Sequence, residues 1–189
     1  MKTWQRLMLP VSVLVCSCSG SSSQTTPGTH ASSNCGQTCQ DAEVGYALDD
    51  TIWLLWNENL AGQPSGAQSK TVSCPLGGTA QITGTTGVAS NGIDTAQLTL
   101  SMQNCGNLNT GYSLAFTGTV TWGGSFNSSA GNAITFKSAS LIIGGAITLY
   151  DNPTIDETCA VSLTDTYDKT AAAQSTWLTG LVCGRTVSL

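Results

Sequence analysis

Cysteine is the residue type of this chain whose number and spacing most clearly indicate chemistry. The chain has eight cysteines in 189 residues but a single histidine, His30. Zinc sites need clustered cysteine and histidine ligands, and the only short spacing downstream of Cys16 and Cys18 is Cys35-Gly-Gln-Thr-Cys39. Cysteine-rich chains of this size are typical of oxidising compartments, where cysteines pair. The pattern favours disulfides over a metal centre, and no cofactor is expected.

The first eighteen residues, MKTWQRLMLPVSVLVCSC, have the three zones of a secretory signal peptide. A basic start is followed by an apolar stretch from Leu7 to Val15 and then by small residues. That stretch is shorter than the roughly 20 residues that a membrane-spanning helix needs. Residues 1–17 are therefore predicted to be a signal peptide that is removed.

The residues Val15-Cys16-Ser17-Cys18 resemble the lipobox of bacterial lipoproteins: an aliphatic residue, a variable one, a small one and the modified cysteine. The resemblance implies that Cys18 receives a diacylglyceryl group, that the chain is cut before it, and that the new amine is acylated, for example with palmitate. It implies a lipid-anchored protein of the bacterial cell envelope. The residue after the modified cysteine is Ser19 and not Asp, which in this class implies the outer membrane. Several acyl chains anchor a domain firmly, since each buried CH₂ contributes about 0.8 kcal/mol. The alternative is ordinary signal cleavage, which gives a secreted soluble protein.

Six cysteines then remain for the domain, and six cysteines can pair in several ways that a sequence does not distinguish. Pairing between sequence neighbours is the simplest arrangement. It gives the candidate disulfides Cys35–Cys39, Cys74–Cys105 and Cys159–Cys183.

Carboxylates are the other groups that could do chemistry. Asp151, Asp156 and Glu157, in the stretch DNPTIDE, are weak candidates for Ca²⁺ ligands in a loop, although Asn-Pro and Asp equally favour a plain turn. Adjacent Asp49 and Asp50 are interpreted as the solvent-facing side of a helix. With the only histidine in the N-terminal tail, no Ser-His-Asp or Cys-His site can form inside the domain. No catalytic residue is expected.

The charge of the chain excludes one large class of partner. Only 9% of residues are charged and the net charge is −5. Outside the signal peptide the cations are Lys70, Lys137, Lys169 and Arg185. Nucleic-acid binding needs a basic patch that displaces counterions from phosphates. A nucleic-acid partner is therefore not expected.

A single helix is predicted to precede the rest of the domain. Residues 18–34 are rich in Ser, Thr and Gly and predict a flexible tether before one domain at 35–189. Between residues 40 and 62, apolar residues recur at spacings of four, four and three on one helix face. Trp53 and Trp56 widen this face. Core packing is the favoured role of the two rings, and ligand contact is the alternative.

From Lys70 onward the apolar period is two, which predicts six or more antiparallel strands. The clearest alternations are TAQITGT, IDTAQLTLSMQ, YSLAFTGTVTW and CAVSLTD. Asn91-Gly92 predicts a type I′ hairpin turn, and a slip of the apolar phase between Phe136 and Leu141 predicts a bulge. The predicted fold is mainly β (α+β): a curled antiparallel meander sheet packed around one N-terminal amphipathic helix and stapled by disulfides.

These patterns predict a lipid-anchored envelope lipoprotein whose domain is a non-catalytic structural or binding module. Its expected partners are the membrane, through the lipid, and an envelope protein. One alternative is a carrier of an apolar ligand or lipid between the helix and the curled sheet. Another is a carboxylate-based hydrolase. Fold alone does not separate these functions.

Overall fold

The computed structural model of the protein describes residues 35–88, 94–109, 111–127, 131–148, 153–166 and 177–189. The predictions made for Cys18, the tether, Asn91-Gly92 and Asp151 concern residues outside these ranges.

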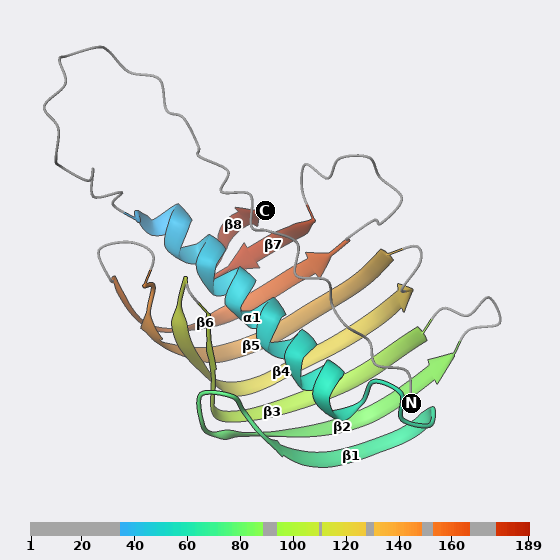
Figure 1. The fold of residues 1–189 in the computed structure, drawn as a ribbon. Helices are drawn as coiled ribbons and strands as arrows, with labels where there is room; N and C mark the ends of the chain where they lie inside the picture. Colours follow the sequence, from blue (N-terminus) through green and yellow to red (C-terminus); the bar gives the residue numbers. More distant parts are fainter. Residues whose placement is uncertain (1–34, 89–93, 110, 128–130, 149–152, 167–176) are drawn as a thin grey trace, which may run out of the picture. The chain divides into compact units, whose positions relative to one another are not determined.

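One helix and eight strands make up the described part of the chain (Figure 1). In chain order they are α1 (Gln37–Asn59), β1 (Gly66–Ser73), β2 (Thr79–Val88), β3 (Asp94–Leu108), β4 (Ser113–Asn127), β5 (Gly131–Ala146), β6 (Thr154–Asp165), β7 (Leu178–Val182) and β8 (Arg185–Ser188). The strands form one antiparallel sheet in the order β1 to β8. The predicted mainly β fold, with one helix and an antiparallel sheet, is confirmed.

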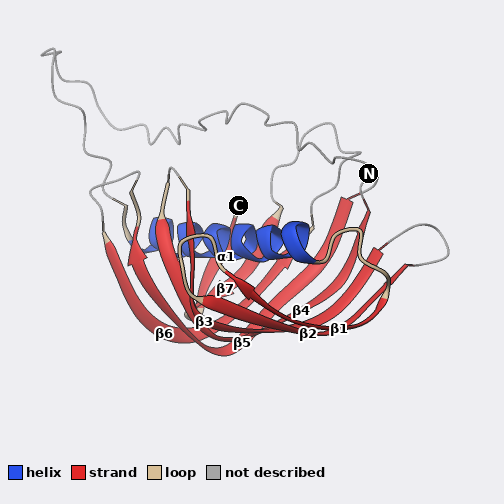
Figure 2. Ribbon diagram, turned by 60° about the horizontal axis from the view of Figure 1, so that its bottom comes forward, coloured by secondary structure: helices blue, strands red, loops and turns tan. Residues whose placement is uncertain are grey.

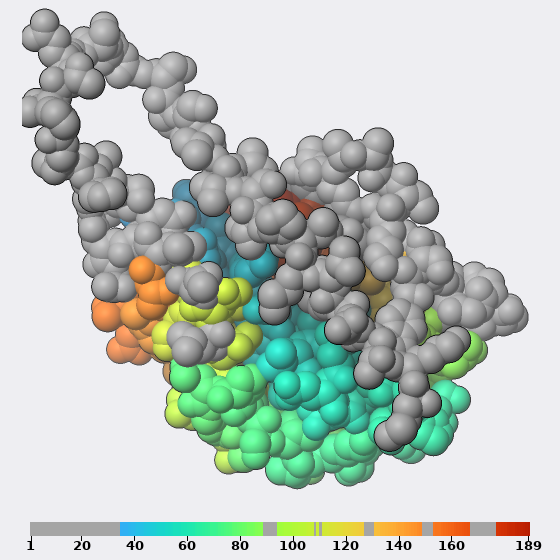
Figure 3. All heavy atoms as spheres, viewed as in Figure 1, coloured from blue at the N-terminus to red at the C-terminus, as the bar shows by residue number. Residues whose placement is uncertain are grey.

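The core lies between α1 and one face of the sheet. In Figure 2 the strands curve beneath α1, which runs along the concave side. On the helix, Val44, Leu48, Ile52 and Leu55 are buried. The sheet contributes the inward residues of its alternating strands, among them Leu98, Leu100, Phe116, Phe136 and Leu163. In the space-filling view of Figure 3, the cyan atoms of α1 adjoin the green atoms of the first strands.

The three disulfides of the structure are Cys35–Cys39, Cys74–Cys105 and Cys159–Cys183. This is the pairing between sequence neighbours. The first joins the residues on either side of the start of α1, the second joins the loop after β1 to β3, and the third joins β6 to the β7–β8 turn. In that turn Cys183 and Gly184 have φ angles of 52° and 75°, as a type I′ hairpin requires.

The predicted irregularity between Phe136 and Leu141 is present in β5. The pairing of β5 with β6 shifts register between Ser138 and Leu141. The pairing of β4 with β5 shifts between Gly118 and Thr121. These bulges change the inward phase, so β5 stays one strand while its apolar residues remain on the core side.

Gly145 in β5 shows why some inward positions carry no side chain. Its φ is 137°, in the region that other residues rarely adopt, and an added Cβ would lie 2.1 Å from the Ser113 carbonyl oxygen of β4. It pairs with the buried residues Leu114 and Ile155, so the position faces the core. A side chain there would push β4 and β5 apart.

We expect Gly145→Ala to lower the free energy of unfolding by about 2 kcal/mol or more, because it combines backbone strain with a steric clash. Gly144→Ala is the matched control. The neighbouring Gly144 has no atom within 4 Å of its added Cβ, so we expect a change below about 1 kcal/mol. Denaturant unfolding followed by circular dichroism measures both, and equal losses would contradict the role assigned to Gly145.

Candidate functional site

Arg185, at the start of β8, makes ion pairs with two acids. Its Nε and Nη2 donate hydrogen bonds to Asp41 Oδ2 and Oδ1 at 2.7 and 2.8 Å. Nη2 also donates to Glu157 Oε2 at 2.8 Å. Asp41 lies on α1 and is 3% exposed, and Glu157 lies on β6. One guanidinium therefore joins the helix to two strands.

The Cys159–Cys183 disulfide lies beside this ion pair. Glu157 and Cys159 are two residues apart on β6, so their side chains share a face. The two sulfurs and a Glu157 carboxylate oxygen lie within 4.8 Å of one another. Both cysteines are partly exposed. We call these five residues the Arg185 cluster: Asp41, Glu157, Cys159, Cys183 and Arg185.

A shallow surface hollow adjoins the cluster at the start of α1. Its lining combines polar residues, among them Gln37, Gln40, Asp41 and Glu157, with apolar ones such as Ile143 and Val182. The hydrogen bonds that Arg185 donates to Asp41, and then the one that it donates to Glu157, raise the pKa of Arg185, so the guanidinium stays charged. Both carboxylates are held by a permanent cation, which suits an electrostatic tie better than proton transfer.

Asp156 and Glu157, two of the three weak candidates for Ca²⁺ ligands, both lie on β6. They are consecutive residues of β6, so their side chains point to opposite faces. Asp156 is exposed, whereas Glu157 is partly buried and paired with Arg185. Asp151 lies outside the described residues.

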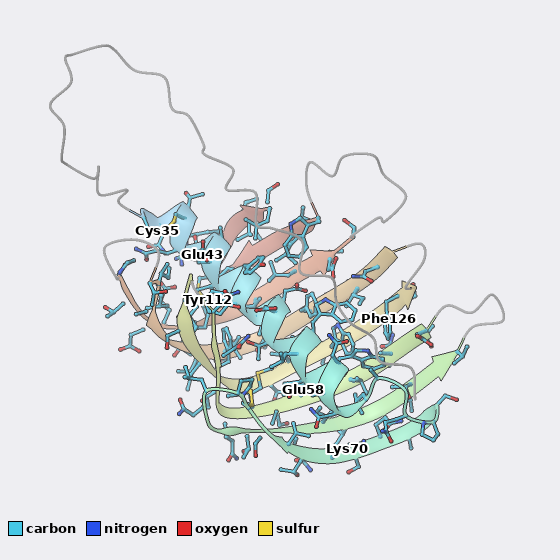
Figure 4. All side chains as sticks on the ribbon, viewed as in Figure 1. Cys35, Glu43, Glu58, Lys70, Tyr112 and Phe126 are labelled. Atoms are coloured by element: carbon cyan, nitrogen blue, oxygen red, sulfur yellow. A yellow bond between two sulfur atoms is a disulfide. The ribbon has the colours of Figure 1, made fainter. Side chains whose placement is uncertain are left out.

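The interpretation of Asp49 and Asp50 as the solvent-facing side of the helix is wrong. Asp49 is 6% exposed. Asp50 accepts hydrogen bonds from the Tyr112 hydroxyl at 2.6 Å and from Asn107 Nδ2 at 3.4 Å. Burial, and then the bond to Asp50, raise the pKa of Tyr112, so its hydroxyl remains a donor. Tyr112, which is labelled in Figure 4, lies beside α1, so the polar flank of the helix that carries Asp50 is in contact with the segment before β4.

Trp53 and Trp56 pack into the core and are each 9% exposed. Their rings meet those of Trp122 and Phe126 edge-on, with centroids 4.6 to 5.6 Å apart. Trp53 Nε1 also donates to Asp165 Oδ2 at 3.2 Å. These contacts favour the packing role over the ligand-contact role, since edge-to-face aromatic pairs stabilise a core.

Sequence reasoning did not anticipate that Arg185, Asp41 and Asp165 would be central. Asp41 and Arg185 are 144 residues apart, and no local pattern links them. One signal was present in the composition. A domain with so few cations offers few partners for its acids, so each buried acid needs one of a small set of donors.

Comparisons of the chain with protein-family models, with curated proteins and with solved structures find no match. Among the described residues, no helix combines the length and the apolar character needed to cross a membrane. The chemistry of the residues themselves is therefore the basis for assigning a function.

We expect Arg185→Met to lower the free energy of unfolding by about 2 kcal/mol. Removing one partner leaves the carboxylate of Asp41 buried without its cation, and the partial exposure of Arg185 reduces the cost from the roughly 3–5 kcal/mol of a fully buried pair. Lys137→Met, at an exposed position of β5, should change stability by less than about 0.5 kcal/mol. Adding Asp41→Asn to Arg185→Met should recover part of the loss. Denaturant unfolding measures the free energy of unfolding of each variant. Equal losses for Arg185→Met and Lys137→Met would refute the stabilising role of the Arg185–Asp41 ion pair.

Glu43 on α1 gives a pH-dependent prediction, because burial raises its pKa. A raised pKa in the folded state means that ionised Glu43 destabilises the fold at neutral pH, and that this cost vanishes as the pH falls below the ordinary glutamate pKa of about 4.3. Glu43→Gln should therefore stabilise the protein at pH 7 and make no difference near pH 3. Thermal unfolding at both pH values measures this, with exposed Glu58→Gln as the control that should not show the pattern.

Proposed function

We propose that this protein is a lipid-anchored lipoprotein of the bacterial cell envelope, attached to the outer membrane through Cys18. The proposal rests on the signal-like segment and the lipobox-like residues Val15 to Cys18. The disulfide-bonded domain supports an extracytoplasmic location, since structural disulfides persist in oxidising compartments.

We propose further that the domain is a non-catalytic structural or binding module in which a curled meander sheet wraps the helix. One observation carries this part: three acids, the buried Asp41 and Asp165 and the partly buried Asp50, are engaged in contacts that hold the fold together. Asp41 is bonded to Arg185, Asp50 to Tyr112, and Asp165 to Trp53. Carboxylates held in this way are poor general acids or bases, which need access to a substrate and a free proton site. The hydrolase alternative would depend on exposed acids such as Asp156.

The carrier alternative needs space for an apolar ligand between helix and sheet. The aromatic rings around Trp53 and Trp56 contact one another instead. We therefore favour a domain that works through its outer surface, with an envelope protein as its partner. Mass spectrometry of lipid extracts from the purified protein separates the two functions, because a carrier would retain a non-covalent lipid.

We expect Cys18→Ser to release the protein from membranes, because the acyl chains would have no attachment site. Membrane pelleting after an alkaline wash, together with incorporation of labelled palmitate, measures the anchor. Cys16→Ser is the matched control, since Cys16 occupies the variable position and should leave both readouts unchanged. A Cys18→Ser protein that still pellets with membranes would show that the anchor lies elsewhere.

A further inference from the structure

We propose that reduction of the Cys159–Cys183 disulfide opens a binding site for a thiophilic divalent metal ion such as Zn²⁺. The ligands are the thiolates of Cys159 and Cys183 and the carboxylate of Glu157. A water molecule completes a four-coordinate shell.

The three ligand atoms are already gathered. The two sulfurs and a Glu157 oxygen lie within 4.8 Å of one another. Within the described residues, this is the group of three potential metal-ligating side chains whose ligand atoms come this close. Zinc binds thiolates at about 2.3 Å and carboxylate oxygens at about 2.0–2.2 Å, which places tetrahedral ligands roughly 3.5–3.8 Å apart. The sulfurs need only separate from their bonded distance to reach this spacing.

The backbone holds the ligands in place without the sulfur–sulfur bond. Glu157 and Cys159 share one face of β6, and the amide of Cys183 donates a hydrogen bond to the Ala160 carbonyl of β6 at 3.0 Å. Neighbouring Val161 and Val182 continue the pairing of β6 with β7. A sheet frame of this kind pre-organises the site, which lowers the cost of binding.

The site differs from the other two disulfides. Cys74 and Cys105 are 6% and 0% exposed, so a reductant reaches them only through unfolding. Cys35–Cys39 belongs to no such ligand group in the described residues. The Cys159–Cys183 disulfide is partly exposed on both sides, and exposed disulfides are the exchangeable ones.

The opening step is an ordinary thiol–disulfide exchange with a dithiol. The thiolate of the reductant attacks one protein sulfur, the sulfur–sulfur bond breaks, and a mixed disulfide forms. The second thiol of the reductant then closes its own disulfide and releases the protein sulfur. The protein gains two electrons and two protons, and the dithiol is oxidised. The metal ion replaces the two thiol protons, which pass to solvent.

Arg185 holds the Glu157 carboxylate while the disulfide is intact. In the disulfide form Glu157 accepts a hydrogen bond from Arg185, whereas Asp41 accepts two from the same guanidinium. Glu157 can therefore move to the metal while Arg185 stays paired with Asp41. The nearby positive charge also favours the thiolate forms that bind metal.

The test uses the full-length protein in detergent, reduced with a dithiol, freed of reductant under anaerobic conditions and titrated with Co²⁺ as a spectroscopic probe. We expect one equivalent to bind with thiolate-to-cobalt absorption in the near ultraviolet, and Zn²⁺ to displace it. The Cys159→Ala/Cys183→Ala variant should lose this band. Glu157→Gln should weaken binding about tenfold or more.

Asp156→Asn is the matched control, because Asp156 neighbours Glu157 on the opposite face of β6; its Co²⁺ affinity should equal that of the wild type. Circular dichroism monitors folding in each sample. The proposal is overturned if the folded, reduced protein binds no Co²⁺, if the disulfide resists the dithiol, if reduction unfolds the sheet, or if the double cysteine variant still binds. If that variant does not fold, the comparison of Glu157→Gln with Asp156→Asn decides, since both variants retain Cys159 and Cys183. Equal Co²⁺ affinities of these two variants would overturn the proposal.

Discussion

The structure depends on one constraint: within the described residues, a sheet with one apolar face has a single helix to cover it. The inward residues of eight strands must be removed from water by the side chains of α1 and by one another. The helix meets this demand with large rings, and Trp53 and Trp56 extend the covered area beyond what aliphatic residues would reach. The outer face follows the opposite rule. Thr83, Thr99 and Thr121 lie in register on neighbouring strands, where hydroxyls remain solvated and β-branched side chains fit the pleat.

The scarcity of charge makes each ion pair specific in position. At the C-terminal end of α1, Lys70 Nζ donates a hydrogen bond to the Asn59 carbonyl at 2.7 Å, where a cation also complements the helix dipole. At the other end Arg185 holds Asp41. β1 and β8 are the two edges of the sheet, so each edge strand supplies the cation that fixes one end of the helix. The two side chains therefore connect the two ends of α1 to the two edges of the sheet.

The sequence was informative where the physics is local. Alternation of period two identified the strands because one face of the sheet is wet, and the phase slip before Leu141 identified the irregular pairing of β5. Disulfide pairing between sequence neighbours was accessible for a related reason, since a meander brings consecutive segments together. The burial of Asp49 could not be predicted, because it depends on how far the sheet surrounds the helix. The ion pair of Arg185 with Asp41 was equally out of reach, since the two residues come from the last and the first elements of the domain.

The position of the Arg185 cluster connects the two parts of the proposed function. The hollow beside it is lined by Gln37, Gln40 and Asp41 of the first turns of α1, directly after Cys35, where the segment leading from Cys18 enters the domain in sequence. The Cys35–Cys39 disulfide fixes that point to the helix. A change in the pairing of Arg185 acts on Asp41 and so on the start of α1, whereas Glu157 can change its partner while Arg185 stays paired with Asp41. Because Asp41 is buried, loss of Arg185 would leave its carboxylate without a cation and would destabilise the fold. The pairing of Asp41 with Arg185 therefore holds the start of α1 in place while Glu157 changes its partner and the Cys159–Cys183 disulfide is reduced.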